Sequence, residues 1–76
     1  MNKNRRKSLQ SIMVSIESVK CELEYVMFEE EYYRDNIPEN LQGSERYAKA
    51  DEACDALSNA INYLEDAIGS IEEAAE

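Results

Sequence analysis

Two stretches of the chain place apolar residues at alternating spacings of three and four, which is the heptad pattern of helices that pack side by side. In the first stretch Glu30 is the only break before Tyr33, and the second stretch continues from Tyr47 to Ala75 without a break. We predict a helix for each stretch and a shared apolar seam between them. The predicted seam positions are Leu9, Ile12, Ile16, Val19, Leu23, Val26, Cys54, Leu57, Ile61, Leu64, Ile68 and Ile71.

The segment between the two stretches predicts a reversal of the chain. It reads DNIPENLQGS, and Pro38 disfavours a helix that continues through Ile37. Ser44 is a residue type that often caps the start of a helix. Long helices joined by so short a connection must fold back on each other, so we expect an all-α, antiparallel coiled-coil hairpin. The expected parts of this single domain are a basic N-terminal tip at 1–7, helix 1 at 8–34, a turn at 35–43 and helix 2 at 44–76.

Four alanines recur every seven residues beside the seam of the second helix. They are Ala53, Ala60, Ala67 and Ala74. Small side chains on one line let a neighbouring helix approach closely, so we interpret the line as a small-residue packing groove. The alternative is that these alanines only raise the helix propensity of the segment.

A second apolar stripe lies on the side of the first helix roughly opposite its seam. Its members are Val14, Ser18, Cys21, Tyr25, Phe28 and Tyr32. A two-helix hairpin buries only one face of each helix, so the stripe predicts a contact outside the hairpin. Two copies that cross antiparallel near Cys21 would form a four-helix homodimer. The other interpretations are a docking face for a foreign protein and apolar residues scattered over the surface.

Length and charge narrow the classes of function. A chain of 76 residues buries too little surface for a large core, which favours self-association. The formal charge is −9, from 17 acidic and 8 basic residues, and four of the basic residues lie within the first seven positions. Direct binding of nucleic acid is disfavoured because a basic face is missing. An acidic exterior could instead occupy a basic nucleic-acid groove of another protein.

The residue types of common catalytic and metal sites are scarce. The chain has no histidine and two distant cysteines, which excludes Ser-His and Cys-His nucleophilic sites and leaves zinc without its usual ligands. Carboxylates at a spacing of three occur only at Glu52 with Asp55 and Glu73 with Glu76. These pairs lie near opposite ends of one helix and should point outward. We expect no catalytic residues, no metal and no cofactor.

The chain also lacks the features of a membrane or secreted protein. No stretch approaches the apolar length of a membrane span, and the basic start leads into an amphipathic helix instead of a signal core. Two cysteines do not make a secreted disulfide framework. We therefore expect a cytoplasmic protein.

The segment DNIPENLQGSERYAKADEACDALSNAI resembles short uncharacterised helical proteins encoded by phages and prophages of Gram-positive bacteria, which carry a DNxPENLQxSxRY turn. The resemblance runs from Asp35 to the end of the chain and implies an origin in a virus or mobile element, with a location in the bacterial host cytoplasm. Together with the acidic exterior and the second stripe, it favours a non-catalytic accessory protein that binds and inhibits a bacterial defence or regulatory protein. The alternatives are a structural coiled-coil module and an oligomer that binds a small molecule near Tyr25, Tyr32 and Tyr33.

Overall fold

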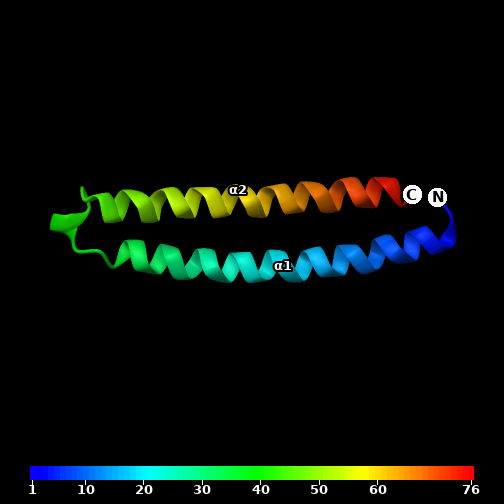
Figure 1. Cartoon of the computed structure of the whole chain (residues 1–76), viewed down its shortest axis with the longest axis horizontal. Helices are drawn as coiled ribbons and strands as arrows, with labels where there is room; N and C mark the ends of the chain where they lie inside the picture. The colour runs from blue at the N-terminus through cyan, green and yellow to red at the C-terminus, as the bar shows by residue number, and fades with distance from the viewer.

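The computed structural model describes all 76 residues and contains two long helices. Helix α1 spans Lys3–Asp35, helix α2 spans Glu45–Ala74, and a short 3-10 helix, η1, spans Glu39–Leu41 in the connection. The helices run antiparallel, and both chain ends lie opposite the connection (Figure 1). The predicted all-α helical hairpin is confirmed.

Helix α1 begins earlier than the sequence indicated. Asn2 caps it, because the Asn2 side-chain oxygen accepts a hydrogen bond of 2.8 Å from the backbone N–H of Arg5. The prediction of a separate basic tip at 1–7 is therefore wrong, since nearly all of this segment forms the first turns of α1. Its positive charges oppose the helix dipole there, but the acidic end of α2 lies at the same end of the hairpin (Figure 1).

The connection is fixed by one buried side chain and one cap. Ile37 follows Asn36, the C-cap of α1, and is only 4% exposed, although no periodic pattern predicts a core residue in the turn. Ser44 caps α2, because its hydroxyl oxygen accepts a hydrogen bond of 3.3 Å from the backbone N–H of Tyr47. Backbone hydrogen bonds from Ile37 to Arg34 and from Ser44 to Leu41 add to the order of the connection.

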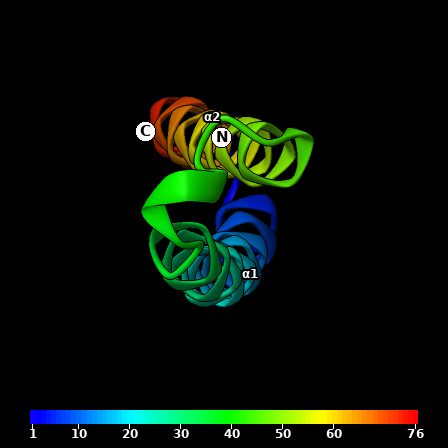
Figure 2. The same cartoon turned by 90° about the vertical axis from the view of Figure 1, so that its left-hand side faces the viewer.

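The core is thin and belongs mostly to α2. Only five residues are buried, and they are Ile37, Ala50, Cys54, Ile61 and Ile68. The last four lie on one side of α2, whereas α1 has no buried residue. In the view along the rod, one helix lies over the other and no third element covers either side (Figure 2). The molecule measures 59 × 15 × 12 Å.

The predicted seam is only partly right on α1. Ile12, Val19 and Val26 are 47, 48 and 50% exposed, so they lie at the edge of the helix contact instead of inside it. The predicted α1 positions that are half-buried are Leu9, Ile16 and Leu23. On α2 every predicted seam position is buried or half-buried. Helix α1 is therefore turned about its axis relative to the predicted register.

Long side chains, apolar and charged in alternation, occupy the line of α1 that turns toward α2. Lys20 and Arg34 take half-buried positions on α1 and form ion pairs with Glu65 and Asp51 of α2. Their aliphatic stems can cover the seam while their charged ends reach the carboxylates. The α1 positions that share this line at a spacing of seven are Met13, Lys20, Met27 and Arg34, and all are half-buried.

Candidate protein-interaction faces

The two sides of the hairpin differ in chemistry. We call the side on which Lys20 and Arg34 of α1 pair with Glu65 and Asp51 of α2 the closed side. There Lys20 Nζ lies 3.5 Å from Glu65 Oε1 and 3.4 Å from Glu17 Oε2. Burial lowers the pKa of Lys20, but the Glu17 carboxylate, with the weaker influence of Glu65, raises it by more. The net pKa is raised, so the ammonium group keeps its charge. Ion pairs thus join the helices on the closed side at Lys20 and Arg34, while nearer the chain ends a hollow of about 400 Å³ lies between Met13 and Glu17 of α1 and Ile68 of α2.

Cys54 is a structural thiol near the closed side. It is buried in the seam, and burial raises the pKa of its thiol because a low-dielectric environment disfavours the thiolate. The guanidinium of Arg34 lowers this pKa, while the carboxylates of Glu31 and Glu30 add to the increase. Cys21 is exposed on α1, and both cysteines are free. A buried, protonated thiol is a poor nucleophile, so Cys54 is not a reactive site.

The second stripe of α1 stands fully in solvent. Val14, Tyr25, Phe28 and Tyr32 are 70, 67, 59 and 73% exposed, and Cys21 is exposed among them. We call these five residues the aromatic face. No part of the hairpin covers it.

The aromatic face contains one shallow hollow, near the turn end of α1. It has a volume of about 370 Å³ and is lined by Tyr25, Phe28, Glu29 and Tyr32. Tyr33, which the sequence grouped with these tyrosines, is not among the lining residues. Within one chain the hollow thus brings together two of the three tyrosines that are predicted to hold a small molecule between two copies.

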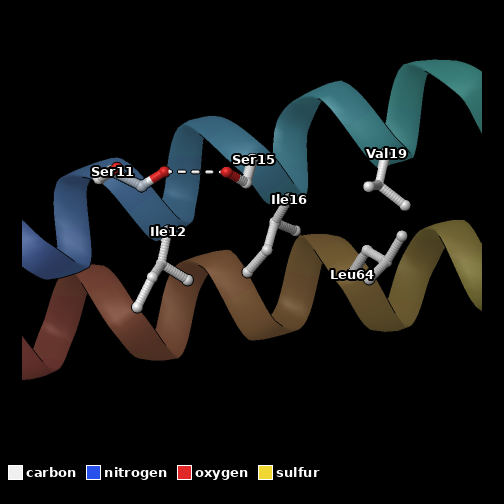
Figure 3. A pocket seen from close by; sticks show the side chains of 6 residues that line it. All are labelled: Ser11, Ile12, Ser15, Ile16, Val19 and Leu64. Carbon is white, nitrogen blue, oxygen red and sulfur yellow. Dashed lines mark hydrogen bonds between the residues drawn. The ribbon is translucent and has the colours of Figure 1, made fainter.

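The side opposite the closed side carries an apolar hollow between the helices, and we call it the open side. The hollow has a volume of about 250 Å³ and is lined by Ser11, Ile12, Ser15, Ile16, Val19 and Leu64. Ile12 and Ile16 point from α1 toward α2, and Val19 faces Leu64 (Figure 3). The Ser15 hydroxyl donates a hydrogen bond of 3.3 Å to the backbone oxygen of Ser11. Because this hydroxyl is satisfied within its own helix, the hollow presents mainly carbon atoms.

The alanine line borders the open side. Helical spacing places Ala53, Ala60 and Ala67 beside the line of Leu57 and Leu64, and these three alanines are half-buried. The fourth alanine, Ala74, is exposed. The line therefore flanks the seam as predicted, but it faces solvent across the open side and no helix of the same chain.

Sequence reasoning missed the open side because it assigned Ile12, Val19 and Val26 to the closed seam. A usable signal was present in the serines. Ser8, Ser11, Ser15 and Ser18 repeat at spacings of three and four along the first half of α1. Two of them, Ser11 and Ser15, line the hollow, and their small side chains leave it open.

The structure has neither a cluster of metal ligands nor a membrane-spanning helix. No group of three or more His, Cys, Asp or Glu side chains is arranged to hold a metal ion. Neither helix is long and apolar enough to cross a membrane. A comparison with known proteins adds no assignment to these faces, because no protein-family model, curated protein or solved structure matches the chain.

Proposed function

We propose that the protein is a non-catalytic helical interaction module that docks a partner protein through its aromatic face. The observation that carries the proposal is the exposure of Tyr25, Phe28 and Tyr32 along one face of a single helix. Large aromatic side chains contribute much of the binding energy of protein interfaces when they enter apolar pockets. A helix that presents such residues at spacings of three and four suits a groove in another protein.

Charge specifies the kind of groove. By helical spacing, the aromatic face is bordered by Glu22 and Glu29 on one side and by Glu17, Glu24 and Glu31 on the other. A partner whose apolar groove has lysine and arginine residues at its rim would complement both borders. The acidic borders would speed association, and the aromatic residues would hold the complex.

The proposal extends to a biological role. The resemblance of the turn segment to phage and prophage proteins suggests that the partner is a bacterial host protein with a defence or regulatory task. A small acidic module would inhibit such a protein by covering a basic, apolar surface that its normal ligand uses. Pairing of two copies into a four-helix bundle belongs to the same proposal, because so thin a core gains stability from a second chain.

Affinity capture from bacterial lysate tests the docking face. Tagged wild type, Phe28→Asp and Asn59→Asp would be compared at low and high salt, with bound proteins identified by mass spectrometry. Asn59 is exposed on α2 away from the aromatic face, so its variant adds the same charge elsewhere. We expect a host protein that is bound by wild type and Asn59→Asp, lost with Phe28→Asp, and retained at high salt.

The opposite result is equally informative. If all three proteins capture the same set, or none captures a host protein, the aromatic face is not a docking site. A structural coiled-coil role would then be favoured.

A further inference from the structure

The hairpin exposes more surface than a compact protein of its size. Its solvent-accessible area is 5639 Å², whereas a folded monomer of 8.7 kDa exposes about 4,700 Å². The excess of about 900 Å² is close to the roughly 800 Å² that each partner loses in a protein interface of standard size. Burial of this excess in one contact of standard size would bring the exposed area per chain to that of a compact monomer.

The open side is the part of this surface that best fits a helical contact. Ile12, Val19 and Val26 repeat every seven residues and are about half exposed, so a second layer of helices could bury what the first leaves open. The hollow beside Leu64 offers a place for side chains of that layer. The closed side also has a hollow, of about 400 Å³, but its lining includes Glu17 and Glu72, and ion pairs cross this side further along the hairpin. A second layer of apolar side chains would have to bury these carboxylates, which is costly.

We propose that a second copy of this chain covers the open side, so that two open sides form the core of a four-helix dimer. This proposal rests on the pairing of two copies that the proposed function includes. It places that contact on the open side and not on the stripe around Cys21. It leaves the aromatic face free on the outside of the dimer, where a partner protein can reach it.

The borders of the two faces favour this choice over pairing through the aromatic face. Two aromatic faces in contact would bring rows of glutamate from both chains together, and like charges across an interface are costly. The open side is bordered on α2 by the alanine line and on the first half of α1 by Ser8 and Ser15. On the second half of α1 the same line continues as Glu22 and Glu29. A second copy that runs antiparallel would place Ser15 and Ser8 opposite these glutamates, so the two charged segments would not meet.

Charge also sets the orientation of the two copies. The half of the hairpin near the turn, residues 21–58, carries eleven acidic and three basic side chains. The half with both chain ends, residues 1–20 and 59–76, carries six acidic and five basic side chains. An antiparallel dimer places each acidic half against a nearly neutral half, whereas a parallel dimer places the two acidic halves together. The antiparallel dimer puts α1 against α1 of the second copy, with Val19 near the two-fold axis.

Sedimentation equilibrium at up to about 100 μM chain tests the pairing, since interfaces of this size give dissociation constants that reach the micromolar range. We expect the mass of two chains for wild type. Val19→Lys should shift the protein to the mass of one chain, because the lysine can reach water in the hairpin but not in the dimer core. Val14→Lys, which adds the same charge to the aromatic face, should leave the dimer intact. Circular dichroism of both variants would show that the helices persist.

Cysteine crosslinking identifies the face without relying on a destabilised variant. Val19→Cys in a Cys21→Ser background places one thiol on the open side at mid-length, whereas the wild-type Cys21 places one on the aromatic face. We expect mild oxidation to join two chains efficiently through position 19 and not through Cys21. Efficient linkage at position 19 also distinguishes the antiparallel from the parallel dimer.

Three outcomes would overturn the proposal. They are the mass of one chain for wild type, crosslinking through Cys21 with dissociation by Val14→Lys, and an assembly larger than two chains. A monomeric wild type would reject the dimer and leave docking through the aromatic face to be judged by the Phe28→Asp capture experiment.

Discussion

Arg34 of α1 donates a hydrogen bond from Nη1 to Asp51 Oδ1 of α2 across 2.9 Å, while its Nε donates to Asp35 Oδ1 at 3.0 Å. One guanidinium thus joins the last turn of α1 both to its own helix end and to the opposite helix. The hydrogen bond to Asp35 raises the pKa of Arg34, so the group stays cationic at any pH that the fold survives. This contact holds the turn end of the closed side together and helps to set the rotation of α1.

Asp51→Asn should weaken this contact without unfolding the hairpin. A partly exposed ion pair contributes little, so we expect the Tm to fall by a few degrees at low salt and by less at high salt. Glu52→Gln is the matched control, since Glu52 is exposed on the next position and is in none of the ion pairs found. Thermal melts of the two variants decide the matter. An equal effect of both would mean that only the net charge counts.

Cys54 should make the fold sensitive to alkaline pH. The folded chain keeps the Cys54 proton to higher pH than the unfolded chain, because burial raises the pKa of this thiol. The unfolded chain therefore loses protons first, and the free energy of unfolding falls as the pH rises above about 8.5. Urea melts between about pH 8 and 10 should show a steeper decline for wild type than for Cys54→Ala. Parallel declines would show that Cys54 is not the group responsible.

The two thiols should also react at different rates. With a thiol-specific reagent at neutral pH, we expect the exposed Cys21 to react at once and the buried Cys54 to react only after denaturation. Cys21→Ser should remove the fast phase and leave the slow one. A single fast phase for both thiols in wild type would contradict the buried position of Cys54.

Ile37 should anchor the turn. Ile37→Ala removes methyl groups from a site that is almost fully buried, and such changes typically cost about 2–4 kcal/mol. Leu41→Ala is the control, because Leu41 is exposed in the same connection and should cost well under that amount. Denaturant unfolding monitored by circular dichroism gives both values. Similar losses for the two variants would mean that the turn is not held by Ile37.

Ala60 tests whether the alanine line is a packing surface. Ala60→Leu adds bulk at mid-length beside the open side, where overpacking costs about 1–3 kcal/mol. Ala56→Leu adds the same group at an exposed position and should be nearly neutral, since leucine is a good helix former. Melts of the two variants, at concentrations where wild type is associated, separate the packing interpretation from helix propensity alone.

The sequence predicted what depends on repetition and missed what depends on single contacts. The heptad of α2 gave its buried line correctly, because Cys54, Ile61 and Ile68 face the only neighbour that α2 has. The rotation of α1 was not predictable from apolar spacing. The line of α1 that turns toward α2 alternates Met13 and Met27 with Lys20 and Arg34, and a heptad rule that counts apolar residues passes over a line of which half is charged.

The aromatic face and the open side also differ in how far the sequence predicts them. The exposed aromatic residues could be predicted, because their stripe lies opposite the seam whichever way α1 is turned by a small angle. The open side could not, because a rotation of one position decides whether Val19 is inside the hairpin or at its edge. Ile37 was missed for a different reason, since a single apolar residue beside a proline in a polar turn carries no periodic signal.

The uneven core also bears on how this protein can change over time. All buried helical residues lie on α2, and α1 contributes none. Substitutions on α2 will often be lost through misfolding, whereas much of α1 can drift while the hairpin survives. Leu9, Ile16 and Leu23 of α1 must still cover α2, but the exposed lines of α1 can change their surface chemistry at little cost to the hairpin.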